Sequence, residues 1–304
     1  MKLVRKIDIH VHTSESGWMT RLPDRPYATP QQLIEMYDMI GVERGVLLPN
    51  ITVETDFSTS SNYETWCTVQ KWPDRFSWFC NLDGRMGSNS PETDFTPYLQ
   101  FVKEKGAKGV GEVCTNLGFD DPLMLNLFRH CEKNSMPVDF HIGNPGRDYG
   151  IVDDIGLPRL EAAINACPDI RFLGHSQKFW AEISGDLTRE QRDGYPTGKV
   201  APGGRIVELM RRYPNLCGDL SAGSGYNAVS RDPDFGYAFM EEFQDRLYYG
   251  TDICDPENIG SPMLKLAKFL DDGVIEGRLS YEAYYKISRG NALKLLGLED
   301  TESK

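Results

Sequence analysis

The chain has 304 residues, of which 40% are hydrophobic and 26% are charged, and its formal net charge is −12 at pH 7. This composition is that of an ordinary globular protein with enough length to bury a large core. The negative charge argues against nucleic acids and anionic membrane surfaces as partners, and no apolar run approaches the ~20 residues of a membrane span.

Short apolar runs typical of β-strands alternate with helical patterns along the whole chain. The predicted strands cover residues 4–11, 44–48, 76–81, 108–113, 137–141, 170–174, 216–220 and 247–250. Strands that alternate with helices form parallel βα units, and eight such units predict an α/β fold of the (β/α)8 TIM-barrel type. No linker or internal repeat interrupts the pattern, so residues 1–304 are predicted to form a single domain.

Several helix starts carry recognisable capping signals. Thr29 and Pro30 supply an N-cap and a proline at the first helical position, and Gln32 could close a capping box. Asp121 and Asp232 each precede a proline in the same manner. Further helices are predicted at 205–212 and 260–270.

Two connections are unusually long. Residues 49–75 follow the second predicted strand, and residues 176–204 follow the sixth. Both leave the carboxyl ends of strands, where barrel enzymes build their active sites. They are expected to act as lids, although surface decoration or a contact between copies in a homo-oligomer is the alternative.

Histidines mark the ends of the predicted strands. His10 and His12 close the first strand and face the same side in a regular strand, while His141 and His175 end the fifth and sixth. Asp252 follows the eighth. Imidazole nitrogens and a carboxylate suit Zn²⁺ or a similar divalent ion. These ligands can converge only if the strands are neighbours in a closed or nearly closed sheet.

Two further residues are predicted to have structural roles and not to bind the metal. His130 is the fifth histidine and lies within a helical pattern at 123–131. Asp8 precedes the first histidine pair.

The cysteines favour a reducing compartment. There are seven, widely spaced and without a C-x-x-C pair, which is typical of a cytoplasmic protein and not of a disulfide framework. The first strand begins almost at Met1, so no signal peptide is expected.

The ordered motifs resemble the amidohydrolase superfamily, and within it the amidohydrolase-related group that includes aminocarboxymuconate-semialdehyde decarboxylase and related hydrolases. The matching segments are His10-Val11-His12, His141, His175, Gly250-Thr251-Asp252 and the C-terminal stretch 287–298, with its Gly-Asn-Ala and Leu-Leu-Gly. They span nearly the whole chain in the expected order.

This resemblance implies a distorted barrel with a divalent metal at its C-terminal mouth. His10, His12, His141 and Asp252 are the implied ligands, and zinc is the expected ion, with manganese or a similar metal as an alternative. Such a metal lowers the pKa of bound water from ~15.7 toward ~7. His175 is expected to polarise the substrate or help activate this water, and Asp252 to accept a proton and pass it to the leaving group.

Glu112 departs from one pattern of the superfamily. In binuclear amidohydrolases a carboxylated lysine often ends the fourth strand, but here Lys108 lies at the start of that strand and Glu112 holds the functional position. Glu112 resembles the glutamate of TatD-type deoxyribonucleases and phosphotriesterase-like lactonases, which can bridge two metals. One ion is the default expectation and two are possible. The alternative role for Glu112 is a hydrogen bond to the substrate or to a residue that itself binds the metal.

Three residues are predicted to contact a small-molecule substrate. Arg147 could bind a carboxylate with both arms of its guanidinium group, Trp18 could pack on a planar substrate, and Lys178 could line the pocket. A surface position is the alternative for Arg147.

The favoured reaction is the hydrolysis of a small carboxylate-bearing lactone, ester or amide. The main alternative is non-oxidative decarboxylation of an aromatic or unsaturated acid. The segment 8–14 also resembles the first motif of PHP-type phosphoesterases, but no histidine follows His175 to complete that site. The acidic charge disfavours a TatD-type nuclease, and a non-catalytic metal-binding protein is the remaining alternative.

Overall fold

In the computed structural model, which describes residues 2–15, 20–22, 25–55, 60–146, 149–261 and 264–300, eight parallel strands form a barrel. The barrel strands are β1 (Lys6–Val11), β4 (Val42–Leu47), β5 (Phe76–Trp78), β6 (Val110–Val113), β7 (Val138–Gly143), β9 (Phe172–His175), β10 (Leu216–Asp219) and β11 (Leu247–Tyr248). All eight predicted strands are therefore confirmed, with boundaries moved by a few residues. Three short strands lie outside the ring, namely β2 (Thr20–Leu22), β3 (Arg25–Pro26) and β8 (Ile151–Val152).

The ring closes through two parallel bridges between its ordered sheets. One sheet runs β1-β4-β5 and the other β11-β10-β9-β7-β6. Cys80, just after β5, pairs with Val110 of β6, and Val11 of β1 pairs with Ile253. Closure brings the carboxyl ends of all eight strands to one mouth.

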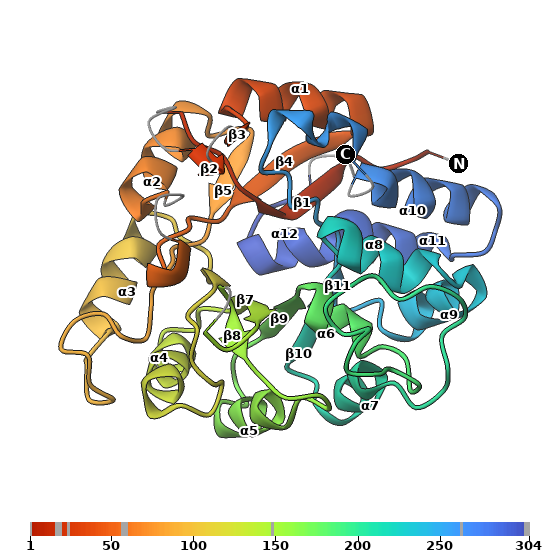
Figure 1. Ribbon diagram of the computed structural model, residues 1–304. Coiled ribbons are helices and arrows are strands. Elements are labelled where there is room, and N and C mark those ends of the chain that lie inside the picture. Colours follow the sequence, from red (N-terminus) through yellow and green to blue (C-terminus); the bar gives the residue numbers. More distant parts are fainter. Residues whose placement is uncertain are drawn as a thin grey trace.

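Helices surround the barrel (Figure 1). They are α1 (Pro30–Ile40), α2 (Asn62–Lys71), α3 (Thr96–Glu104), α4 (Pro122–Lys133), α5 (Pro158–Ala166), α6 (Gln177–Ala181), α7 (Arg205–Arg212), α8 (Ala222–Ser230), α9 (Pro233–Glu242), α10 (Lys265–Ile275), α11 (Tyr281–Tyr285) and α12 (Asn291–Leu296). The described residues also form 3-10 helices η1 (Val53–Thr55) and η2 (Pro256–Gly260) and a π-helical segment η4 (Lys286–Gly290). The capping box of Thr29 and Gln32 is present at α1. No helix among the described residues is long and apolar enough to cross a membrane.

Both long connections contain helical structure. α2 occupies ten of residues 49–75, and its N-cap, Ser61, accepts a hydrogen bond from the Glu64 amide. Residues 176–204 begin with α6. The helix predicted at 260–270 starts later, at Lys265, because η2 fills the preceding turn.

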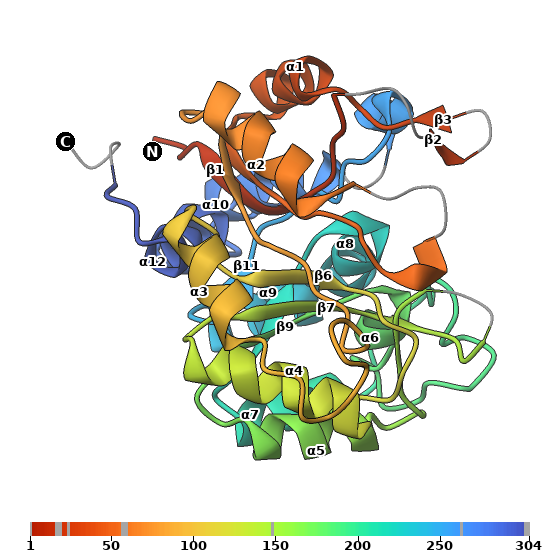
Figure 2. The same cartoon turned by 90° about the vertical axis from the view of Figure 1, so that its left-hand side faces the viewer.

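The barrel interior is apolar at its lower end and is sealed there by α12. Ile7 and Ile9 of β1 cluster with inward side chains from other strands, and Leu293 and Leu296 of α12 join the same cluster. Figure 2 shows α12 on the left, beside the start of β1, and the β2–β3 hairpin on the opposite side. The seal leaves the C-terminal mouth as the open end of the barrel.

A bulge in β1 turns the histidines inward. Asp8 pairs with Gly45 and Val11 pairs with Leu47, so three steps along β1 match two along β4. Before the bulge, Asp8 faces outward and accepts a hydrogen bond from the Tyr37 hydroxyl of α1 at 2.7 Å. A bulge of this kind re-aims the side chains that follow it, and the structural role predicted for Asp8 is consistent with these contacts.

Candidate metal and active site

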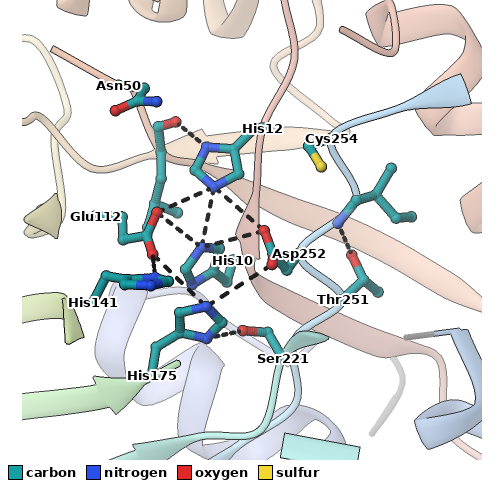
Figure 3. Close-up of polar contacts among 12 residues, drawn as sticks. His10, His12, Asn50, Glu112, His141, His175, Ser221, Thr251, Asp252 and Cys254 are labelled. Atoms are coloured by element: carbon teal, nitrogen blue, oxygen red, sulfur yellow. Dashed lines mark hydrogen bonds and ion pairs between the residues drawn. The ribbon is translucent and has the colours of Figure 1, made fainter. Parts of the chain in front are cut away.

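The predicted histidines and acids converge at the barrel mouth (Figure 3). Each comes from the carboxyl end of a different strand, apart from the pair on β1. The contributors are His10 from β1, His12 just after β1, Glu112 from β6, His141 from β7, His175 from β9 and Asp252 from the segment after β11. All except His141 and Asp252 are buried.

Four of these side chains place donor atoms around one point. The Nε2 atoms of His10 and His12 lie 3.2 Å apart. Glu112 Oε2 lies 3.5 Å from His12 Nε2 and 3.8 Å from His10 Nε2, and Asp252 Oδ1 lies at the same two distances. Ligands about 2.0–2.1 Å from a tetrahedral zinc ion stand roughly 3.3–3.4 Å apart. The donor set therefore fits a divalent cation.

Hydrogen bonds at the far nitrogens orient both imidazoles of β1. His12 Nδ1 is 2.8 Å from the Leu48 carbonyl oxygen, which can only accept. His10 Nδ1 is 2.6 Å from Asp219 Oδ2. In the neutral rings each Nδ1 carries the hydrogen, so each Nε2 keeps a lone pair directed at the site.

The other oxygen of Glu112 belongs to a second group. Glu112 Oε1 lies 2.8 Å from His141 Nδ1 and 3.7 Å from His175 Nε2. The structure thus places His141 beside Glu112 and not directly in the group formed by His10 and His12. Glu112 lies between two sets of donors, an arrangement suited to bridging.

Two buried carboxylates lie beneath the histidines and were not predicted from the sequence. Asp219 accepts from His10 Nδ1 and from the Ser221 hydroxyl, the latter at 2.7 Å. Asp139 Oδ1 lies 3.5 Å from His10 Nδ1. Asp139 stands two residues before His141 on β7, and Asp219 ends β10. A charged residue inside an apolar strand was the available signal for both.

Burial and neighbouring charges shift the pKa values in opposite directions. Burial raises the pKa of Asp139 well above its usual range. Burial alone lowers the pKa of His10, but the charges of Asp219 and Asp139 outweigh it and raise that pKa. Burial and the neighbouring His10 lower the pKa of His175 to about 4, so its imidazole is neutral at pH 7.

The carboxylate of Glu112 is held ionised. Burial by itself raises its pKa, but hydrogen bonds with His12 and His141 outweigh burial and keep that pKa well below the ordinary value. A buried carboxylate facing four imidazoles is a strong cation ligand once those rings are neutral.

A small cavity of about 40 Å³ opens onto these groups. Its lining residues are His12, Tyr27, Asn50, Glu112, His141, Tyr149, Asp252 and Cys254. The Tyr149 ring lies 4.9 Å from the His141 ring, centre to centre. The side-chain oxygen of Asn50 is buried without a hydrogen-bond partner in the described structure, which suits contact with a ligand.

The structure describes only one of the three residues predicted to contact the substrate. Trp18 and Arg147 lie outside the described residues, so their predicted roles stay predictions. Lys178 is buried on α6, and its ammonium group pairs with Asp193. His130 lies on α4 away from the cluster, 3.1 Å from Asp94.

Comparison with known proteins identifies the family. A family model described as "Amidohydrolase" matches residues 7–298, whereas no curated protein gives a significant match. Solved structures share the barrel. A probable 2-pyrone-4,6-dicarboxylic acid hydrolase from Acinetobacter baumannii, solved with citric acid bound, has TM-score 0.61 and 18% identity over 97% of this chain and 100% of that chain.

Two further structures are similar over nearly their full lengths. The 2,6-dihydroxybenzoate decarboxylase from Rhizobium has TM-score 0.59 and 13% identity, covering 97% of this chain and 99% of that chain. An amidohydrolase from Burkholderia multivorans with bound zinc has TM-score 0.61 and 14% identity, covering 98% of this chain and 100% of that chain. At these identities the solved structures show a shared fold. The family match, which spans nearly all of the chain, shows that this protein belongs to the amidohydrolase family, in the amidohydrolase-related group that its motifs resemble.

Proposed function

We propose that this metal-dependent amidohydrolase-type enzyme hydrolyses a small carboxylate-bearing lactone, ester or amide. The observation that carries the proposal is the convergence of His10, His12, Glu112 and Asp252. The two histidine Nε2 atoms lie 3.2 Å apart, and one oxygen of each carboxylate lies 3.5–3.8 Å from both of them. Zinc is the proposed ion. Nitrogen and carboxylate donors at this spacing suit it, and the bound zinc of the Burkholderia multivorans protein supports the choice.

The metal and the side chains would supply different parts of the hydrolytic chemistry. A divalent metal at such a site supplies Lewis acidity and a water of lowered pKa. We propose that Asp252 would accept a proton in the hydrolytic step and deliver it to the leaving group. Its Oδ2 lies 3.9 Å from His175 Nε2, so the two acid–base groups face the same reacting volume.

The number of metals depends on Glu112. We propose one ion among His10, His12, Glu112 Oε2 and Asp252. The second donor group, at Glu112 Oε1, offers a place for another ion. His141 would serve that second group.

Glu112→Gln is expected to lower the metal content, because a neutral amide replaces a charged donor whose two oxygens face the two groups. Elemental analysis of the purified wild type should find about one zinc or similar ion per chain. A wild-type content of two ions that falls to one in the variant would instead assign Glu112 as a bridge. If Glu112→Gln keeps both the metal content and the turnover of the wild type, Glu112 is neither a metal ligand nor a catalytic residue.

Decarboxylation is the second candidate, because the structurally similar proteins include a decarboxylase as well as a hydrolase. Two features favour hydrolysis. The chain keeps both histidines of the first-strand motif, whereas several decarboxylases of the group have glutamate in place of the first. Glu112 resembles the glutamate of hydrolytic branches.

Isotope labelling separates the two reactions. The zinc-loaded protein should be incubated in ¹⁸O-labelled water with a panel of small lactones, esters and amides that carry a carboxylate. We expect one ¹⁸O atom in the product acid, because hydrolysis takes its oxygen from water. Release of CO₂ from an aromatic or unsaturated acid without label uptake would reject hydrolysis. Metal binding without turnover on either panel would favour a non-catalytic protein.

A further inference from the structure

The Ser221 hydroxyl connects a buried carboxylate to a site histidine. Ser221 is the N-cap residue of α8, yet its side chain makes no capping bond to that helix. It lies 2.7 Å from Asp219 Oδ2 and 2.8 Å from His175 Nδ1. Ser221 and Asp219 are completely buried, and Figure 3 shows the serine beside His175.

Counting hydrogens assigns the direction of each bond. A serine hydroxyl has one hydrogen. Asp219, when ionised, can only accept, so Ser221 donates that hydrogen to it. The contact with His175 must therefore run the other way, with Nδ1–H donating to the serine oxygen. A neutral imidazole has one N–H, so His175 Nε2 bears a lone pair.

Asp219 controls a second ring through the same oxygen. Its Oδ2 also accepts from His10 Nδ1 at 2.6 Å, and its Oδ1 accepts from the Ser221 amide at 2.9 Å. One carboxylate thus fixes the hydrogen of His10 directly and that of His175 through Ser221. In their neutral forms both rings then present Nε2 to the site as an acceptor.

We propose that Asp219 and Ser221 are positioning residues that hold His175 in its Nδ1–H tautomer. In this state His175 acts on the reaction as a hydrogen-bond or proton acceptor and not as a donor to the substrate carbonyl. The inference rests on the proposed function for its catalytic meaning, and it selects water activation over substrate polarisation. His175 Nε2 lies 3.7 Å from Glu112 Oε1, so its lone pair faces the donors grouped around the metal.

The tautomer can be observed without a substrate. ¹⁵N NMR of the zinc-loaded full chain, labelled at histidine, should show the His175 proton on Nδ1 and none on Nε2. His175→Asn assigns the signal by its disappearance. A proton on Nε2 of His175 in the wild type would overturn the proposal.

Ser221→Ala tests the connection itself. We expect the His175 signal to lose its single Nδ1–H form, because Nδ1 has lost its acceptor and Asp219 Oδ2 is 3.5 Å away. Ser288→Ala is the matched control, since Ser288 is also fully buried but its hydroxyl has no hydrogen-bond partner in the described structure. An unchanged His175 tautomer in Ser221→Ala would reject the role of Ser221.

Asp219→Asn should alter the signals of both His10 and His175 and weaken zinc binding by roughly 10–100-fold, as for loss of a hydrogen-bond partner behind a ligand. Once a substrate is known, Ser221→Ala should lower kcat by about 10–100-fold with little change in KM. If ¹⁸O uptake fails while the tautomer is as expected, the proposed reaction is wrong and the positioning role stands. The reverse result rejects only the positioning role.

Discussion

Asp252→Asn should lower turnover by roughly 10²–10⁴-fold, the effect typical of losing a positioned acid–base group. Asparagine keeps the size and one oxygen of the side chain, so it can still contact the site. It cannot accept the proton that hydrolysis must move to the leaving group. The backbone of Asp252 is held beside β1, because its N–H donates to the His10 carbonyl oxygen at 2.8 Å.

The measurement compares initial rates of zinc-loaded wild type and variant, normalised to their measured metal contents. Asp272→Asn is the control, because Asp272 is a carboxylate on α10 that pairs with Lys268 at the surface. Retention of more than half of the wild-type rate per bound ion in Asp252→Asn would assign the proton transfer to another group.

His12→Ala should remove most of the bound metal. His12 Nε2 lies within 3.2–3.5 Å of three other donor atoms, so its loss leaves both a missing ligand and an open gap. Removing a residue that only hydrogen-bonds to a metal ligand typically weakens metal binding about 10–100-fold. Removing a direct ligand should therefore weaken metal binding by more than about 100-fold. Elemental analysis after dialysis against a weak chelator measures the effect.

His130→Ala is the matched control for this experiment. It removes the one histidine that lies away from the barrel mouth. His130 is on α4, where its ring contacts Asp94 and Phe95. This variant should keep wild-type metal content. Full occupancy in His12→Ala would exclude His12 as a ligand.

The periodic features of the fold and the strand-end position of the site were predictable from the sequence. β-type runs alternate with helical patterns, and this order alone specifies parallel strands with a shared carboxyl edge. His10, His12, His141 and His175 could be placed at that edge because each follows a short apolar run. The helix α2 was missed because its sequence is rich in threonine and aromatic residues, which are weak helix formers.

The details that organise the site depend on three-dimensional contacts. Regular alternation would have aimed Asp8 with His10, whereas the bulge in β1 separates them. The partition of donors between the two oxygens of Glu112 depends on side-chain rotation. The contact between Ser221 and His175 joins residues 46 positions apart. None of these arrangements has a local sequence pattern.

Closure of the barrel by its first strand and last helix also constrains how the chain is made. β1 leaves the ribosome before the rest of the barrel, yet Asp8 is bonded to Thr251, 243 residues later, and the Arg5 carbonyl to Arg289, 284 residues later. Until those late segments emerge, one edge of β1 and the lower apolar layer lack their partners, an exposure that invites aggregation. Nascent chains should therefore depend on chaperones until α12 has emerged, and nonsense mutations that remove α12 and the residues after it should yield insoluble protein despite an intact set of metal-site residues.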